Sequence, residues 1–144
     1  MTLTLFENTF VTLDDANNYF NNRPNSDAWV NLSNSEKEQA LLFATLKINS
    51  LPFIGSKLSE EQPLEFPRNF SPQMPSEIKF GVCEEALAIL QNSVHSQNKM
   101  LGIESMSVGS SSVSYTKQDF ANTIISIQAN AFLSKWLAKN FNMN

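Results

Sequence analysis

Residues 48–70 read I-N-S-L-P-F-I-G-S-K-L-S-E-E-Q-P-L-E-F-P-R-N-F, and they join the end of a strongly patterned helix to a segment that cannot continue it. Pro52, Pro63 and Pro67 each fix φ and remove a backbone donor, whereas Gly55 frees the backbone. Large apolar side chains nevertheless recur through the stretch: Phe53, Ile54, Leu58, Leu64, Phe66 and Phe70. Disordered linkers contain few aromatic residues. We therefore expect an ordered connector that packs against helices on both sides.

Capping signals predict three helical segments before this connector. Thr12 stands three residues before Asp15 and predicts the start of a short first helix, which the sequence Asn21–Asn25 ends. A helical turn over Asp27–Leu32 is expected to bury its tryptophan, Trp29.

The next helix has the strongest pattern in the chain. Ser33 and Ser35 each precede a glutamate by three residues, so two overlapping capping boxes leave the first residue of the helix open. An apolar stripe then follows at helical spacing until Pro52 ends it: Ala40, Leu41, Ala44, Ile48 and Leu51.

Downstream of the connector, Pro75 predicts the start of a third long helix, whose stripe is Ile78, Val82, Ala86 and Leu90. His95–Asn98 is interpreted as a polar loop. The segment at about 101–115 alternates apolar and polar residues around Gly109, which is typical of a hairpin or a flexible loop. A C-terminal helix is expected at about 119–140, with one apolar face: Ile124, Ile127, Ala131, Phe132, Trp136 and Leu137.

These elements predict one mainly α domain over residues 1–144, a small bundle of about four helices with an extended hairpin or loop and terminal arms. The helical core covers about 12–92 and is completed by the C-terminal helix. The N-terminus lacks a basic region and a long apolar run, and no apolar run is long enough to span a bilayer. We therefore expect a soluble, intracellular protein without a membrane partner.

Charge is sparse and acidic. Charged residues make up 17% of the chain, against the usual quarter, and the net charge is −4. Interface cores are depleted of charge, so this composition is compatible with large protein contacts, although a compositional bias of the source genome explains it equally well. Lysines and arginines are scattered with no two adjacent, which argues against a dedicated nucleic-acid groove.

The sequence predicts no catalytic site, no metal site and no cofactor. His95 is the one histidine and has no nearby helical carboxylate, so a solvated side chain is favoured over a functional one. Cys83, the one cysteine, is expected to be a small buried hydrophobe. Neighbouring carboxylates, as in Glu84–Glu85 and Glu60–Glu61, point away from each other on a helix and cannot form one acid–base site.

The order of several short motifs resembles a family of tailed-bacteriophage proteins, the head–tail connectors or adaptors. The matching pieces run in the family's order over roughly the first ninety residues: Phe10–Ala16, Tyr19-Phe20, Trp29, Glu38–Leu41, Phe53-x-Gly55, Gln62-x-Leu64-x-Phe66-Pro67-Arg68 and Pro75-x-Glu77-Ile78. Relatives of this family are also described as DnaT-like single-stranded-DNA-binding proteins.

The resemblance implies a virion structural protein of the neck, assembled in the host cytoplasm and located at the head–tail junction. It implies a homo-oligomeric ring, dodecameric to match the portal, that continues the DNA channel without binding DNA specifically. Its partners would be the portal protein and a stopper or tail-completion protein. Candidate interface residues lie at Arg68, in the 101–115 segment and near the C-terminus: Arg68, Met106, Val108, Val113, Tyr115, Phe132, Trp136 and Phe141.

Two other interpretations stay open. Eleven phenylalanines, two tryptophans and two tyrosines offer stacking surfaces for a single-stranded-DNA-binding accessory protein of phage replication, although core packing is the ordinary explanation for most of them. A plain host protein-interaction module is the third alternative. For Arg68, an internal ion pair or carbonyl cap competes with the interface role.

Overall fold

The computed structural model describes residues 3–70, 72–106 and 124–138. Within these residues the regular elements are helical, and the three β-bridges are isolated pairs, which confirms the predicted mainly α fold. The elements are α1 (Leu13–Asn21), α2 (Asp27–Val30), α3 (Asn34–Asn49), α4 (Ser76–Met106), α6 (Ile127–Leu133) and the 3-10 turn η1 (Ser134–Trp136).

The predicted helix starts before the connector are confirmed. Thr12 caps α1 by accepting from the backbone N–H of Asp15 at 3.1 Å. Of the two possible capping boxes, the structure uses the one between Ser33 and Glu36: the Ser33 hydroxyl accepts from the Glu36 N–H, and the Glu36 carboxylate accepts from the Ser33 N–H. Trp29 in α2 is fully buried, as expected.

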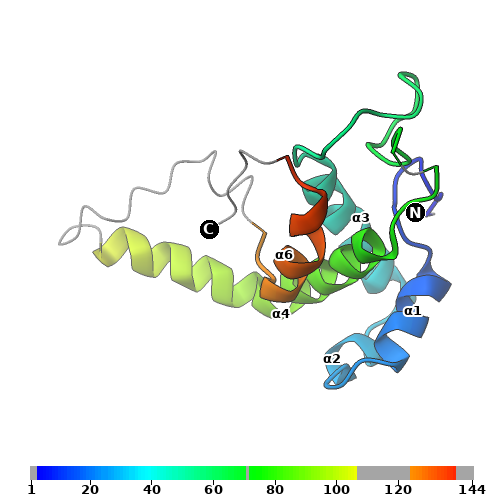
Figure 1. Ribbon diagram of the computed structural model, residues 1–144. Coiled ribbons are helices and arrows are strands. Elements are labelled where there is room, and N and C mark those ends of the chain that lie inside the picture. The colour runs from blue at the N-terminus through cyan, green and yellow to red at the C-terminus, as the bar shows by residue number, and fades with distance from the viewer. Residues whose placement is uncertain (1–2, 71, 107–123, 139–144) are drawn as a thin grey trace.

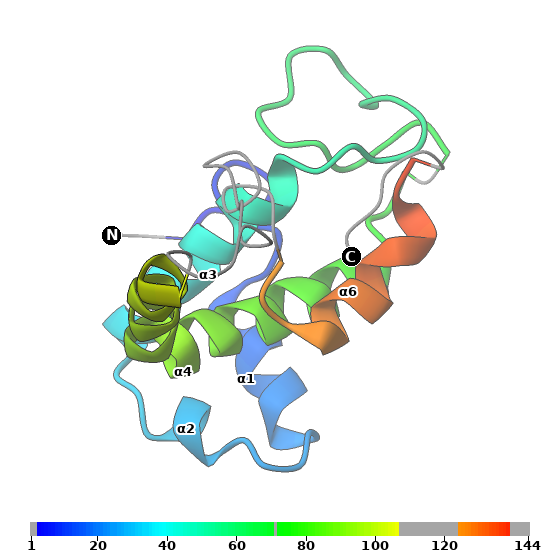
Figure 2. The ribbon, with the colours of Figure 1, turned by 90° about the vertical axis from the view of Figure 1, so that its left-hand side faces the viewer.

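Helix α4 forms the centre of the bundle. Helices α1, α2, α3 and α6 all contact it, and the two views show α3 and α6 on different sides of it (Figures 1 and 2). The later half of α4 extends beyond the other helices (Figure 1). The core gathers around its first half and includes Phe20, Trp29, Leu41, Ile48, Phe66, Ile78, Leu87 and Leu133.

The polar loop expected at His95–Asn98 was a wrong prediction, because α4 continues through it to Met106. Residues 91–100 contain neither proline nor glycine, so no residue there breaks the helix. Gly102 lies near its end, where a single glycine costs only about 1 kcal/mol relative to alanine. The extended conformation expected from residue 101 is therefore wrong up to Met106, and residues 107–115 lie outside the described part.

The connector is ordered and packed, as predicted. Phe53, Leu64 and Phe66 are buried, and the Phe66 ring meets Phe53 edge-on with centroids 4.9 Å apart. Gly55 has φ +75°, a left-handed conformation that favours glycine, and the bond before Pro67 is cis. Leu58 and Phe70 depart from the expectation because more than a third of each is exposed.

The C-terminal helix is shorter than the predicted 119–140 range. It begins at Ile127, because Ser126 is extended and its hydroxyl caps the helix by accepting from the Ala129 N–H at 3.0 Å. The predicted apolar face is also wrong in part: Ile127 is 80% exposed, whereas Ala129 and Leu133 are buried. Leu133 lies against Gly81 of α4, where an added Cβ would meet its side chain at 2.9 Å.

The C-terminal segment also pairs with the connector. The Ile54 N–H donates to the carbonyl of Trp136, and the Ala138 N–H donates to the carbonyl of Pro52, both at 2.9 Å. Leu137, beside this pair, is buried. The end of the described chain therefore belongs to the core.

Two adjacent glutamates of α4 hold the bundle together. Glu84 binds Arg23 through two hydrogen bonds, at 2.6 and 3.1 Å, and accepts from the Tyr19 hydroxyl. Glu85 is fully buried, pairs with Lys47 of α3 at 2.5 Å, and accepts from the backbone N–H groups of residues 125 and 126 at 3.1 and 2.9 Å. The two carboxylates thus have separate partners, and together they tie α4 to α1, α3 and α6.

We expect Glu85→Gln to lower the free energy of unfolding by about 3 kcal/mol, because it leaves the Lys47 ammonium without its buried counter-charge. Urea denaturation followed by circular dichroism measures this change. The exposed Glu61→Gln is the matched control and should stay within about 0.5 kcal/mol of the wild type. Equal stability of the two variants would show that the Glu85 pair does not hold the bundle.

Candidate functional site

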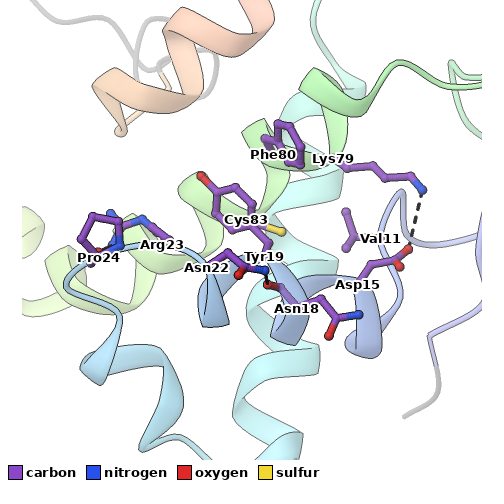
Figure 3. Close-up of a pocket in the computed structure, with 10 residues that line it drawn as sticks. All are labelled: Val11, Asp15, Asn18, Tyr19, Asn22, Arg23, Pro24, Lys79, Phe80 and Cys83. Carbon is purple, nitrogen blue, oxygen red and sulfur yellow. Dashed lines mark hydrogen bonds and ion pairs between the residues drawn. The ribbon is translucent and has the colours of Figure 1, made fainter.

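The residues that line one shallow pocket come from Val11 before α1, from α1 itself, from the loop that follows it, and from α4 (Figure 3). The pocket has a volume of about 550 Å³. At one end the Tyr19–Arg23–Glu84 cluster is closed by its own hydrogen bonds. At the other end Lys79 faces Asp15 across 3.6 Å.

Two of the pocket's titratable groups, Tyr19 and Cys83, are held in their protonated forms. Burial, and then the hydrogen bond to Glu84, raise the pKa of Tyr19 well above its usual value. Burial also raises the pKa of the Cys83 thiol, so this cysteine stays protonated and unreactive. The expected buried role of Cys83 is confirmed, since 1% of it is exposed. These groups stabilise the contact between α1 and α4 and do not form an activated nucleophile.

A second hollow lies on the outer face of α3. It has a volume of about 510 Å³, and the N-terminal arm and the connector form its edges, with Glu7 on one side and Pro63 on the other. Its floor is apolar, because Phe43 is 53% exposed and Leu46 is 63% exposed. We call this hollow the α3 groove.

The structure places Arg68 inside its own chain. Its guanidinium is 4% exposed, donates to the carbonyls of Phe53, Ile54 and Gly55, and pairs with the Glu65 carboxylate at 2.7 Å. This geometry matches the internal alternative that the sequence left open. Arg68 fixes the turn of the connector.

The structure describes three of the other predicted interface residues: Met106, Phe132 and Trp136. Phe132 is half-buried and meets Phe80 with ring centroids 5.5 Å apart. Trp136 is half-buried and stacks on Phe70 at 5.4 Å. Met106 is the last residue of α4. The remaining candidates lie outside the described residues: Val108, Val113, Tyr115 and Phe141.

Sequence reasoning missed Phe43 and Leu46. It assigned α3 one apolar stripe, which the structure buries, but these two side chains stand off that stripe. The missed signal was a large apolar residue at a position that should face water. The reasoning also missed the partners of Glu84 and Glu85, although acidic residues between Cys83 and Ala86 in an apolar helix already indicated buried pairs.

Most cations lie near a carboxylate wherever the structure describes side chains, in residues 3–70, 72–91 and 124–138. All but Lys37 pair with a carboxylate within 4 Å: Arg23, Lys47, Lys57, Arg68, Lys79 and Lys135. Lys37 is buried, donates to Asn17 and lies 5.7 Å from the centre of the Trp29 ring. This part of the surface therefore has no track of unpaired positive charge.

Two further searches cover the same part of the chain. No group of three or more His, Cys, Asp or Glu side chains among the described residues is placed to hold a metal ion. No helix within the described ranges is long and apolar enough to cross a membrane.

The described residues form a small helical bundle with large apolar side chains exposed on α3 and α6. The chain belongs to the family described as "Putative DnaT-like ssDNA binding protein", whose model matches residues 5–144. This description agrees with the DnaT-like name that relatives of the head–tail connectors also carry. Comparison with curated proteins and with solved structures finds no match.

We expect the stability of the wild type to fall more steeply with pH than that of Tyr19→Phe. The raised pKa keeps Tyr19 protonated in the folded state, while the unfolded chain releases this proton near pH 10. The stabilisation is therefore complete below about pH 10 and is lost as the pH rises above it.

Urea unfolding of both proteins between about pH 8 and about pH 11 measures the difference, because all other titrating groups are shared. The stability gap between them should narrow as the pH rises. A constant gap would mean that Tyr19 does not keep its proton in the fold.

Proposed function

We propose that this protein is a structural assembly protein of a tailed phage, a head–tail connector. It forms a ring beneath the portal, continues the DNA channel and provides the docking platform for the stopper or tail. This role needs neither catalysis nor a cofactor.

One observation carries the proposal: the described surface exposes large apolar side chains while its cations are paired. Val30, Phe43, Leu46 and Ile127 are each more than half exposed. Of these, Phe43 and Leu46 lie together on the outer face of α3, and exposed apolar groups that gather on one face mark protein contacts. DNA-binding surfaces instead owe their affinity to cations that neutralise phosphates. The described residues therefore favour contacts with other protein chains.

Single-stranded-DNA binding is the second candidate, and the family description favours it. One cluster in the structure suits it. Phe70 and Trp136 are stacked with an angle of 8° between their rings, and the Lys135 ammonium lies 5.1 Å from the Trp136 ring centre. Aromatic rings beside a cation are what sequence-independent binders of single strands use. Phe70 is 39% exposed, so part of this platform is open to solvent.

A titration of a labelled oligothymidine separates the two candidates. We expect no saturable change in fluorescence anisotropy at low or moderate salt, because all the described cations except the buried Lys37 already face carboxylates. A single-stranded-DNA-binding domain of known activity serves as the positive control. Tight binding that weakens steeply as salt rises would contradict the connector and support the second candidate.

If the oligothymidine binds, the Trp136→Ala variant tests whether the Phe70–Trp136 platform is the binding site. Loss of binding in this variant, with Phe132→Ala unaffected, would place the strand on the Phe70–Trp136 platform. Stacking of one base on one ring is worth about 1–3 kcal/mol, so a weakening of at least about fivefold is expected for a direct contact.

A further inference from the structure

The second half of α3 is apolar on both of its faces. The inner face packs in the core through Leu41, Ala44 and Ile48, which are fully buried. The outer face carries Phe43 and Leu46. A helix that is hydrophobic all round is normally buried all round. The outer face of α3 therefore has the composition of a surface that is normally buried in a contact.

The α3 groove is shaped to receive another chain. Leu42, Phe43 and Leu46 form its floor, and Pro63 and Leu64 of the connector border it. Glu7 is the one charged residue among those that line it, and the remaining polar side chains are neutral amides. An uncharged apolar centre with polar edges is typical of a protein interface.

A second apolar surface lies on α6. Ile127 is 80% exposed, and Ile125 just before the helix is 39% exposed. Ala131 and Lys135 follow Ile127 at intervals of four residues, and both are exposed. Lys135 is the one charged residue between Ile124 and Ala138. We call this surface the α6 patch.

The two surfaces face different directions. Helices α3 and α6 pack on different sides of α4 (Figure 2). A two-fold contact joins identical surfaces, whereas contact between two different surfaces repeats from copy to copy and closes into a ring when the rotation allows it. Two separate apolar surfaces therefore suit a head-to-tail arrangement.

Their charges are complementary. The α3 groove carries a single carboxylate at its edge, Glu7. Beside the α6 patch, Arg23 and Glu84 pair with each other, which leaves Lys135 as the charge that the patch itself offers. The Lys135 side chain is 66% exposed, and its ion pair with Glu77 is long, at 3.7 Å. It can therefore reach a carboxylate of a neighbouring chain, whereas contact between two α3 grooves would bring two carboxylates together.

We propose that the α3 groove of one copy receives the α6 patch of a second copy of this chain. Ile127 enters the groove beside Phe43 and Leu46, and Lys135 approaches Glu7. This docking rests on the ring proposed above and assigns its lateral contact. Because α4 holds α3 and α6 on different sides, each copy offers one groove and one patch, and the contact propagates around the ring.

Disulfide trapping tests the docking. Leu46→Cys and Ile127→Cys are made separately and together, since both positions are exposed and the native Cys83 is buried. Mild oxidation of an equal mixture of the two single variants should give a crosslinked heterodimer. Either variant alone should stay mostly uncrosslinked, and the double variant should give a ladder of multimers. Glu60→Cys, on the exposed part of the connector, replaces Leu46→Cys in the control mixture and should give no crosslinked heterodimer with Ile127→Cys.

Mass photometry compares the oligomeric state of the wild type with that of the Phe43→Asp variant. The variant should associate at least about tenfold more weakly, with an unchanged circular dichroism spectrum, because more than half of Phe43 is exposed. If the wild type forms oligomers but the Leu46–Ile127 mixture does not crosslink, the docking is wrong and the ring stands. Homodimers of Leu46→Cys alone would also overturn it. A wild type that stays monomeric, with no crosslink in any mixture, would contradict the ring as well.

Discussion

The buried carboxylate of Glu85 is the constraint on which the rest of this fold depends. A charge inside a protein is tolerated only when its partners are complete, and Glu85 obtains them from α3 and from the segment before α6. If either element moved away from α4, the Glu85 carboxylate would be buried without a complete set of partners, which is strongly destabilising. Glu84 binds Tyr19 and Arg23 in the same way on the adjacent side. Two neighbouring residues thus set where α1, α3 and α6 pack on the central helix.

This arrangement also relates the fold to the proposed assembly. Because both inner faces are fixed against α4, the outer faces of α3 and α6 are held in a constant relation to each other. A ring protein needs this property, since small errors in the angle between neighbours prevent closure. Arg68 stabilises the connector in the same manner by binding successive carbonyls, and the connector then borders the α3 groove. Among the side chains that the structure describes, these ion pairs also involve most of the cations.

Local signals in the sequence predicted the mainly α fold, the cap at Thr12, a capping box at Ser33 or Ser35, the buried stripe of α3 and the packed connector. These features depend on neighbouring residues, so a linear pattern contains them. The wrong predictions concern helix boundaries, some of which depend on contacts between residues distant in the sequence. The start of α6 depends on Glu85, which is remote in sequence, and α4 continues past His95 although its polar residues resembled a loop. Of the candidate interface, Arg68 was found as a motif, but its internal partners and the exposed pair on α3 required the fold.

Quantitative mass spectrometry of purified particles, from a phage that encodes this chain, tests the central claim most directly. A connector is a fixed part of the neck, so the account predicts that the protein is present in mature particles in a constant ratio to the portal protein, and that it survives washing at high salt. Its absence from purified particles, together with abundance in the infected cell, would contradict the connector and favour a DNA-binding role in replication.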